Sequence, residues 1–196
     1  MRLDTRDSPA NPYRGGVLGL SVEATPWRMD RAAAAKVEAD GRYVLRVPPV
    51  FHRGGDPDEE NPPTDVIALS SWFQWALGDL PFYQLPSLGG RDTLRGYIGN
   101  RWTGEAAWHT AAEYRFWFLP RGIAFTDAVR IERLGGALFF EMGSVAGTPG
   151  GLLRAAVRNS WGVSLRLGFE RSTLFRLDVG FSDEGHAITL AHGLSF

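Results

Sequence analysis

The stretch TLFRLDVGFSDEGHAITLAHGLSF, residues 173–196, decides the fold because apolar side chains recur at every second position along most of it. The apolar positions are Phe175, Leu177, Val179 and Phe181 before the central turn and Ile188, Leu190, Leu194 and Phe196 after it. Small or charged residues, such as Arg176 and Asp178, occupy the opposite face of the first segment. A period of two predicts half-buried strands, and the short connection at 183–185 predicts a hairpin between them.

The same alternation extends through most of the chain, at 18–24, 36–47, 67–77, 108–118, 136–142 and 161–170. Together with the two strands of the hairpin in residues 173–196, these segments make about eight antiparallel strands. Each is roughly 10–15 residues long, which exceeds the usual strand of about 5–6 residues and is enough to cross a bilayer at a tilt. The predicted fold is therefore all-β.

The two faces of these strands carry different kinds of side chain, and this difference indicates what surrounds the sheet. The apolar faces are large and aromatic, whereas the opposite faces carry small residues with Glu, Asp and Arg at intervals. That pattern is typical of an up-and-down transmembrane β-barrel, with apolar side chains facing lipid and polar ones facing the lumen. A soluble ligand-binding barrel, with the aromatic residues inside and the charges outside, remains the alternative on alternation alone.

Composition excludes several classes of function. The 196 residues carry 21 basic and 22 acidic side chains, so no basic excess indicates nucleic-acid binding. Cysteine is absent, and the four histidines lack metal-ligand spacing. Neither a phosphate-binding GxxxxGK[ST] motif nor a GxSxG nucleophile motif around Ser144 is present. We therefore predict a single domain over 1–196 that is not an enzyme and has no metal, catalytic residue or cofactor.

The first residues, MRLDTRDSPANP, lack the apolar core of a signal peptide, and no run of about 18 apolar residues indicates a spanning helix. Taken alone, this leaves either a cytoplasmic protein or a targeting segment outside the sequence. A barrel in the membrane is compatible with both observations, because its strands are only mildly hydrophobic on average.

One loop, over 78–104, stands out by its length and by the segment LGGRDTLRGY at 88–97. A loop of this length is unusual unless it is functional. Its Leu94-Arg95-Gly96-Tyr97 motif is followed by EYRF at 113–116 and FFEMGSV at 139–145, and it is preceded by DTRD at 4–7. In this order and spacing, the set closely resembles the C-terminal barrel half of the bacterial surface antigen family, the BamA/TamA-like outer-membrane insertases and translocators.

The resemblance implies a position for each motif. In that family, the loop folds into the lumen of a sixteen-strand barrel, and its arginine pairs with a carboxylate on the inner wall. Carried over, the arginine is Arg95 and the carboxylate is Glu141, where the family more often has aspartate. Gly89 and Gly90 would be hinges that permit tight turns. The C-terminal Gly193, Leu194 and Phe196 would form the assembly signal and one side of a seam between the first and last strands.

The resemblance also implies a location and partners. We expect a multi-pass β-barrel in the bacterial outer membrane, in contact with lipid and with client outer-membrane proteins during their insertion, assembly or translocation. The alternative is a structural anchor for a fused soluble domain, because related barrels occur joined to patatin-like lipases. POTRA repeats ahead of the barrel would favour the insertase, and a catalytic domain would favour the anchor.

The number of predicted strands limits how this chain can close into a barrel. An eight-strand barrel has an interior just wide enough for side chains and cannot also hold a long loop. We therefore expect either a missing N-terminal barrel half or two copies that complete one barrel; a lone eight-strand barrel with the loop outside is the third possibility. The connection at 48–64, rich in Gly, Pro and acidic residues, is predicted to be flexible. Its length is unusual for the periplasmic side, where turns are short.

Overall fold

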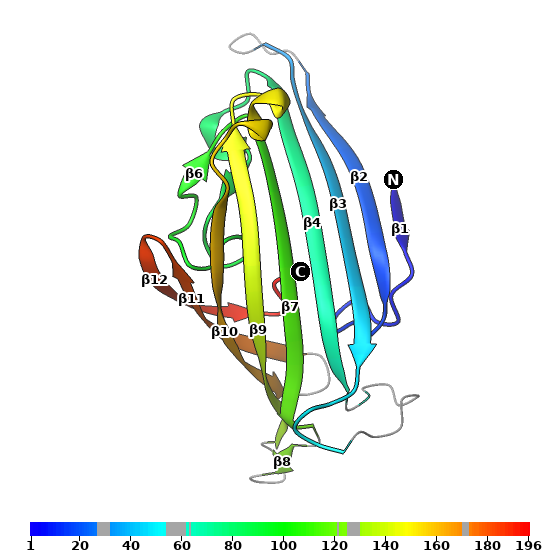
Figure 1. Cartoon of the computed structure of the whole chain (residues 1–196). Helices are drawn as coiled ribbons and strands as arrows, with labels where there is room; N and C mark the ends of the chain where they lie inside the picture. Colours follow the sequence, from blue (N-terminus) through cyan, green and yellow to red (C-terminus); the bar gives the residue numbers. More distant parts are fainter. Residues whose placement is uncertain (27–31, 54–61, 63, 121, 125–129, 170–172) are drawn as a thin grey trace.

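The structure, a computed structural model, describes residues 1–26, 32–53, 62, 64–120, 122–124, 130–169 and 173–196 (Figure 1). Its long elements are β2 (Gly15–Thr25), β3 (Ala34–Val47), β4 (Asp65–Gly78), β7 (Ala106–Leu119), β9 (Arg130–Ala146), β10 (Arg158–Phe169), β11 (Thr173–Ser182) and β12 (Gly185–His192). None of the helical segments that the structure describes has the length and apolarity of a membrane-spanning helix. The all-β prediction and its long strands are confirmed.

Short elements supplement these strands. They are β1 (Arg2–Asp4), β5 (Ser87–Leu88), β6 (Trp102–Thr103), β8 (Ile123–Ala124) and the 3-10 turns η1 (Phe82–Gln84) and η2 (Pro149–Leu153). The alternation did not predict them, because strands of two or three residues are too short to establish a period and 3-10 turns do not alternate. Four of the six, η1, β5, β6 and η2, lie in the two long loops that follow β4 and β9.

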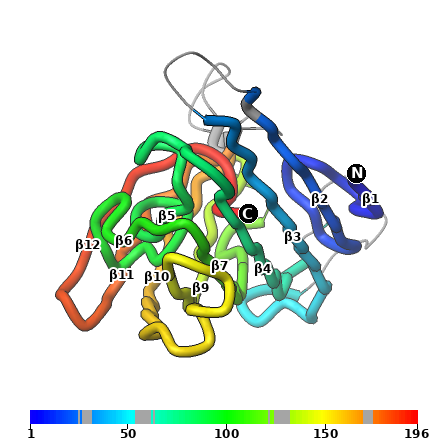
Figure 2. Tube along the Cα trace, turned by 90° about the horizontal axis from the view of Figure 1, so that it is seen from above, coloured from blue at the N-terminus to red at the C-terminus, as the bar shows by residue number. Residues whose placement is uncertain are grey.

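The sheet is an antiparallel meander. Its order is β1-β2-β3-β4-β7-β9-β10-β11-β12, with β8 pairing with β9, so neighbours along the chain are neighbours in the sheet. Ladders are long and regular; β3 and β4 pair without interruption from Ala34↔Gly78 to Val47↔Asp65. Seen from above, the strands form an open arc, and no pairing between β1 and β12 closes it among the described residues (Figure 2).

The two faces of the arc have opposite chemistry. The convex face exposes large apolar side chains on every long strand, among them Leu18, Leu45, Leu69, Phe140, Val163, Leu177 and Leu190. The concave face buries polar and charged ones, including His109, Glu113, Arg115, Glu141, Arg166, Arg176 and Asp178. This is the orientation expected of a membrane barrel and the reverse of a soluble one.

The last strand is shorter than its sequence pattern indicates. Alternation placed Phe196 on the same apolar face as Ile188 and Leu190, but β12 ends at His192 and Gly193 adopts a left-handed φ of +79°. Glycine adopts that conformation without a Cβ penalty, so the chain leaves the sheet there. Phe196 instead packs inside the arc against Tyr13, Val44, Val66 and Ala68. The placement of Phe196 on the outer face was therefore wrong.

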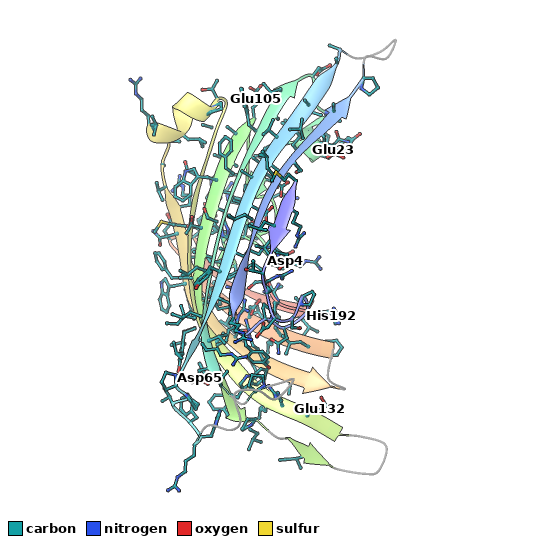
Figure 3. All side chains as sticks on the ribbon, turned by 90° about the vertical axis from the view of Figure 1, so that its right-hand side faces the viewer. Asp4, Glu23, Asp65, Glu105, Glu132 and His192 are labelled. Carbon is teal, nitrogen blue, oxygen red and sulfur yellow. The ribbon has the colours of Figure 1, made fainter. Side chains whose placement is uncertain are left out.

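The predicted flexible connection at 48–64 falls largely outside the described residues, which in this segment comprise 48–53, 62 and 64. Those that are described lie at the end of the sheet where β4 begins. The side-chain view places Asp65 at this end and Glu105 at the opposite one (Figure 3). These two residues mark the lower and the upper end of the sheet, respectively.

Candidate functional site: a loop locked on the inner wall

The loop between β4 and β7 folds over the concave face of the arc, where β5 and β6 lie inside the curve (Figure 2). Its tip is held by a small apolar cluster of Leu88, Leu94 and Tyr97, with Trp72, Trp102 and Val145 packed against it. Gly89 and Gly90 have φ of +109° and +108°, so the chain turns sharply there. Asn100 donates its backbone N–H to the carbonyl of Gly89 at 3.1 Å, which closes the base of the tip.

Arg95 is the centre of the tip and is fully buried. Its backbone N–H and its Nε donate to the two carboxylate oxygens of Glu141, at 2.6 and 2.9 Å. Such a two-point, charge-assisted contact fixes orientation as well as distance. The guanidinium also lies over the ring of Phe139, 3.5 Å from its centroid. The structure thus brings together Arg95 and Glu141, and the extra methylene of glutamate does not prevent the contact.

Two further carboxylates reach the same guanidinium, and the sequence reasoning missed both. Nη2 donates to Glu113 of β7 at 3.2 Å, and Nη1 lies 3.6 Å from Asp178 of β11. Both residues belong to the polar faces of their strands, so alternation could place them on the inner wall. It could not show that three strands present carboxylates at one height, because that depends on register between strands.

A second layer of arginines balances these carboxylates. Glu113 also pairs with Arg115 and Arg166, and Asp178 accepts from Arg176 at 2.8 Å. Arg176 in turn reaches back to the loop, donating to Asp92 at 2.9 Å. Four arginines therefore face four carboxylates, and all but Asp92 have nearly or fully buried side chains. Buried charges require such pairing, because an unpaired one is strongly destabilising.

Glycines in the wall make room for the loop backbone. A Cβ on Gly180 would lie 2.5 Å from the carbonyl carbon of Arg95, and one on Gly96 would lie 2.5 Å from the carbonyl oxygen of Phe181. Real side chains do not make contacts this close, so glycine is needed on both sides. Ser182 then donates its hydroxyl to the carbonyl of Gly96 at 2.9 Å. The loop is thus seated on β11 by backbone contact as well as by charge.

A model of the Omp85 superfamily domain matches residues 1–189. The chain belongs to the Omp85 superfamily. This superfamily comprises outer-membrane β-barrel proteins of insertion and translocation, which work with membrane lipid and client proteins and are not enzymes. This superfamily match confirms the predicted resemblance to the BamA/TamA-like surface antigen family. Among curated proteins, none matches the sequence.

The Omp85 domain also ties its loop to the turn between β11 and β12. Tyr97 donates its hydroxyl to Asp183 at 2.5 Å, and Arg101 donates to Glu184 at 2.8 Å. Burial of the phenol, followed by the hydrogen bond to Asp183, raises the pKa of Tyr97 to about 12. The loop and the β11–β12 hairpin are therefore joined by a hydrogen bond and an ion pair between side chains.

The C-terminal tetrapeptide of the Omp85 domain meets the same charged cluster. Ser195 donates its hydroxyl to Oε2 of Glu113 at 2.8 Å, the oxygen that also accepts from Arg95. Arg115 donates to the carbonyl of Phe196 at 3.1 Å and lies over its ring. Ser195 of the tail and Arg95 of the loop thus share Glu113. Neither the loop motif nor the C-terminal pattern signals this link.

A polar cavity of about 850 Å³ lies between the loop and β2–β4 of the Omp85 domain. Acidic and basic side chains line it together, among them Glu38, Lys36 and Arg42. Within the described ranges, no three His, Cys, Asp or Glu side chains are grouped as metal ligands. The cavity therefore presents acidic and basic side chains together on the lumen side of the sheet.

Proposed function

We propose that this Omp85 domain is a BamA/TamA-like barrel module of the bacterial outer membrane that assists the insertion, assembly or translocation of outer-membrane proteins. One observation carries the proposal: the loop tip is fixed on the inner wall by Arg95 and three carboxylates on three strands. A loop held this firmly keeps the wall from β7 to β11 in one arrangement. A client would need such a stable wall beside a strand edge that can accept it.

The strand edge is the second part of the mechanism. No strand pairs with the outer edge of β12 among the described residues, so its backbone groups on that side are available. An unpaired edge is a template for another strand, and main-chain hydrogen bonds supply the affinity. In this mechanism, the client adds to the edge of β12 and the loop holds the wall. Gly193, Leu194 and Phe196 would form the end of the seam once the tail leaves the lumen and extends β12.

The test is client assembly in cells that depend on this protein, with the full chain carrying Arg95→Ala. The matched control is Arg91→Ala, because Arg91 lies on the same loop and its exposed side chain pairs, among the described residues, with the exposed Asp92. We expect Arg95→Ala to lower the folded, heat-modifiable fraction of a client barrel at equal membrane levels, with Arg91→Ala near wild type. Normal client assembly in the Arg95 variant would refute the proposal and leave the anchor role as the better interpretation.

A further inference from the structure

Asp65, the first residue of β4, is buried although it lies on the face of the sheet that is otherwise exposed. It shares strand parity with Ile67 and Leu69, which are exposed on the convex face, yet Asp65 itself is 0% exposed. Its cover comes from the connection that follows β3. Val50 donates its backbone N–H to Oδ2 of Asp65 at 3.0 Å, so this part of the connection folds back over the outer face.

The wall supplies a second bond to the same oxygen. Tyr114 of β7 donates its hydroxyl to Oδ2 of Asp65 at 2.6 Å. Thr64 adds a bond from its hydroxyl to the carbonyl of Val47 at 3.0 Å, which fixes the other end of the connection. The carboxylate therefore holds residues 48–51 against the outer face of the sheet. An ordinary turn at this point would make no contact with that face.

Phe51 continues an aromatic series on the convex face. Its ring centroid lies 5.0 Å from that of Phe116 and 5.2 Å from that of Phe118, and Phe116 also contacts Tyr114. Val50 and Phe51 nevertheless remain 70% and 54% exposed. Leu119 and Ile123 are also exposed at this end of the wall. Aromatic residues at this position are typical of the girdles at a membrane–water interface.

We propose that Val50 and Phe51 form an interfacial lipid anchor, which inserts into the leaflet at the lower end of the barrel. The occupant is the phospholipid of that leaflet, because the patch is continuous with the apolar convex wall that the Omp85 barrel presents to the bilayer. The anchor rests on the membrane placement in the proposed function, and it gives residues 48–51 a role.

The chain has no cysteine, so single labelling sites are simple to introduce. Val50→Cys keeps the backbone bond to Asp65 and would carry an environment-sensitive fluorophore in vesicles of phosphatidylcholine, with or without bromine on the acyl chains. Leu165→Cys, on the exposed face of β10, reports insertion of the wall. Leu153→Cys, 92% exposed in η2 at the upper end, is the aqueous control.

We expect the Val50 label to shift to the blue and to be quenched by bromines near the headgroup, at a shallower depth than the Leu165 label. The Leu153 label should show neither effect. Quenching at Leu165 with none at Val50 would overturn the anchor while leaving the barrel in the membrane. Absence of quenching at both sites would instead count against the proposed function, on which the anchor rests.

A second variant pair tests the aromatic contact itself. Phe51→Asp should weaken quenching of the Val50 label several-fold, because a charge at the interface disfavours insertion, whereas Phe51→Trp should preserve it. Heat-modifiable mobility of both variants verifies that the barrel is folded. Equal quenching in the Asp and Trp variants would contradict insertion of this segment.

Discussion

Removal of Arg95 should cost the Omp85 barrel more than removal of its partner Glu141. In Arg95→Ala, Glu113 keeps Arg115 and Arg166, and Asp178 keeps Arg176. Among the described residues, the hydrogen bonds that Glu141 keeps come from the hydroxyl of Ser160 at 2.9 Å and the backbone N–H of residue 95. A buried carboxylate without a cation is destabilising by about 3–5 kcal/mol.

The reverse substitution leaves a smaller deficit. In Glu141→Ala, the guanidinium of Arg95 still contacts two carboxylates, Glu113 and Asp178, although it shares them with Arg115, Arg166 and Arg176. The loss is then that of charged hydrogen bonds, about 1.5–3 kcal/mol. The double variant Arg95→Ala/Glu141→Ala should be more stable than Arg95→Ala alone, because it removes the orphan carboxylate. A thermodynamic cycle over the four proteins isolates this coupling.

The assay is urea unfolding of the folded barrel in detergent, followed by heat-modifiable mobility and tryptophan fluorescence, with the free energy of unfolding taken by linear extrapolation. Arg91→Ala, at an exposed pair, is the control and should lie within about 0.5 kcal/mol of wild type. The reasoning is refuted if Glu141→Ala costs as much as Arg95→Ala, or if the double variant is less stable than both single variants.

Three further outcomes are expected from the same contacts. Gly180→Ala should release the loop to protease, because its Cβ would clash with the loop backbone, whereas Gly168→Ala in β10 meets nothing closer than 3.4 Å and should not. Ser195→Ala should increase proteolysis of the C-terminal tetrapeptide and destabilise the barrel by about 1 kcal/mol, through one lost hydrogen bond to Glu113; unchanged proteolysis would argue against docking of the tail. Because the pKa of Tyr97 rises from 10.0 to about 12, its stabilisation is present below pH 10 and is lost as the pH rises toward 12. Tyr97→Phe should reduce the alkaline dependence of the free energy of unfolding, and an identical dependence in the variant would contradict the assignment.

The fold could be predicted from the sequence because the alternation that defines each strand involves only neighbouring residues. Alternation over ten or more residues fixes both a strand and its two faces, so the meander and the apolar-out orientation can be inferred from neighbouring residues. The Arg95–Glu141 contact was found through family motifs. Glu113, Asp178 and Gly180 were not found, because their meeting with the loop depends on how far each strand is shifted along its neighbour. The inward turn at Gly193 was missed because one left-handed residue overrides an otherwise regular pattern.

Glu113 connects features that lie far apart in the chain. Its Oε2 accepts from Arg95 of the loop and from Ser195 of the tail, while Oε1 accepts from Arg115 at 3.2 Å. If the tail left the lumen to extend β12 as a strand, Glu113 would lose one donor and its remaining charge would be shared among the arginines. Conversely, release of the loop would remove Arg95 from Oε2 of Glu113 and so strengthen the hydrogen bond from Ser195 to the same oxygen. The seam and the lock are therefore linked energetically through one carboxylate, and Glu113→Gln should loosen both in the same protein, which protease cutting at 88–97 and at the C-terminus can measure together.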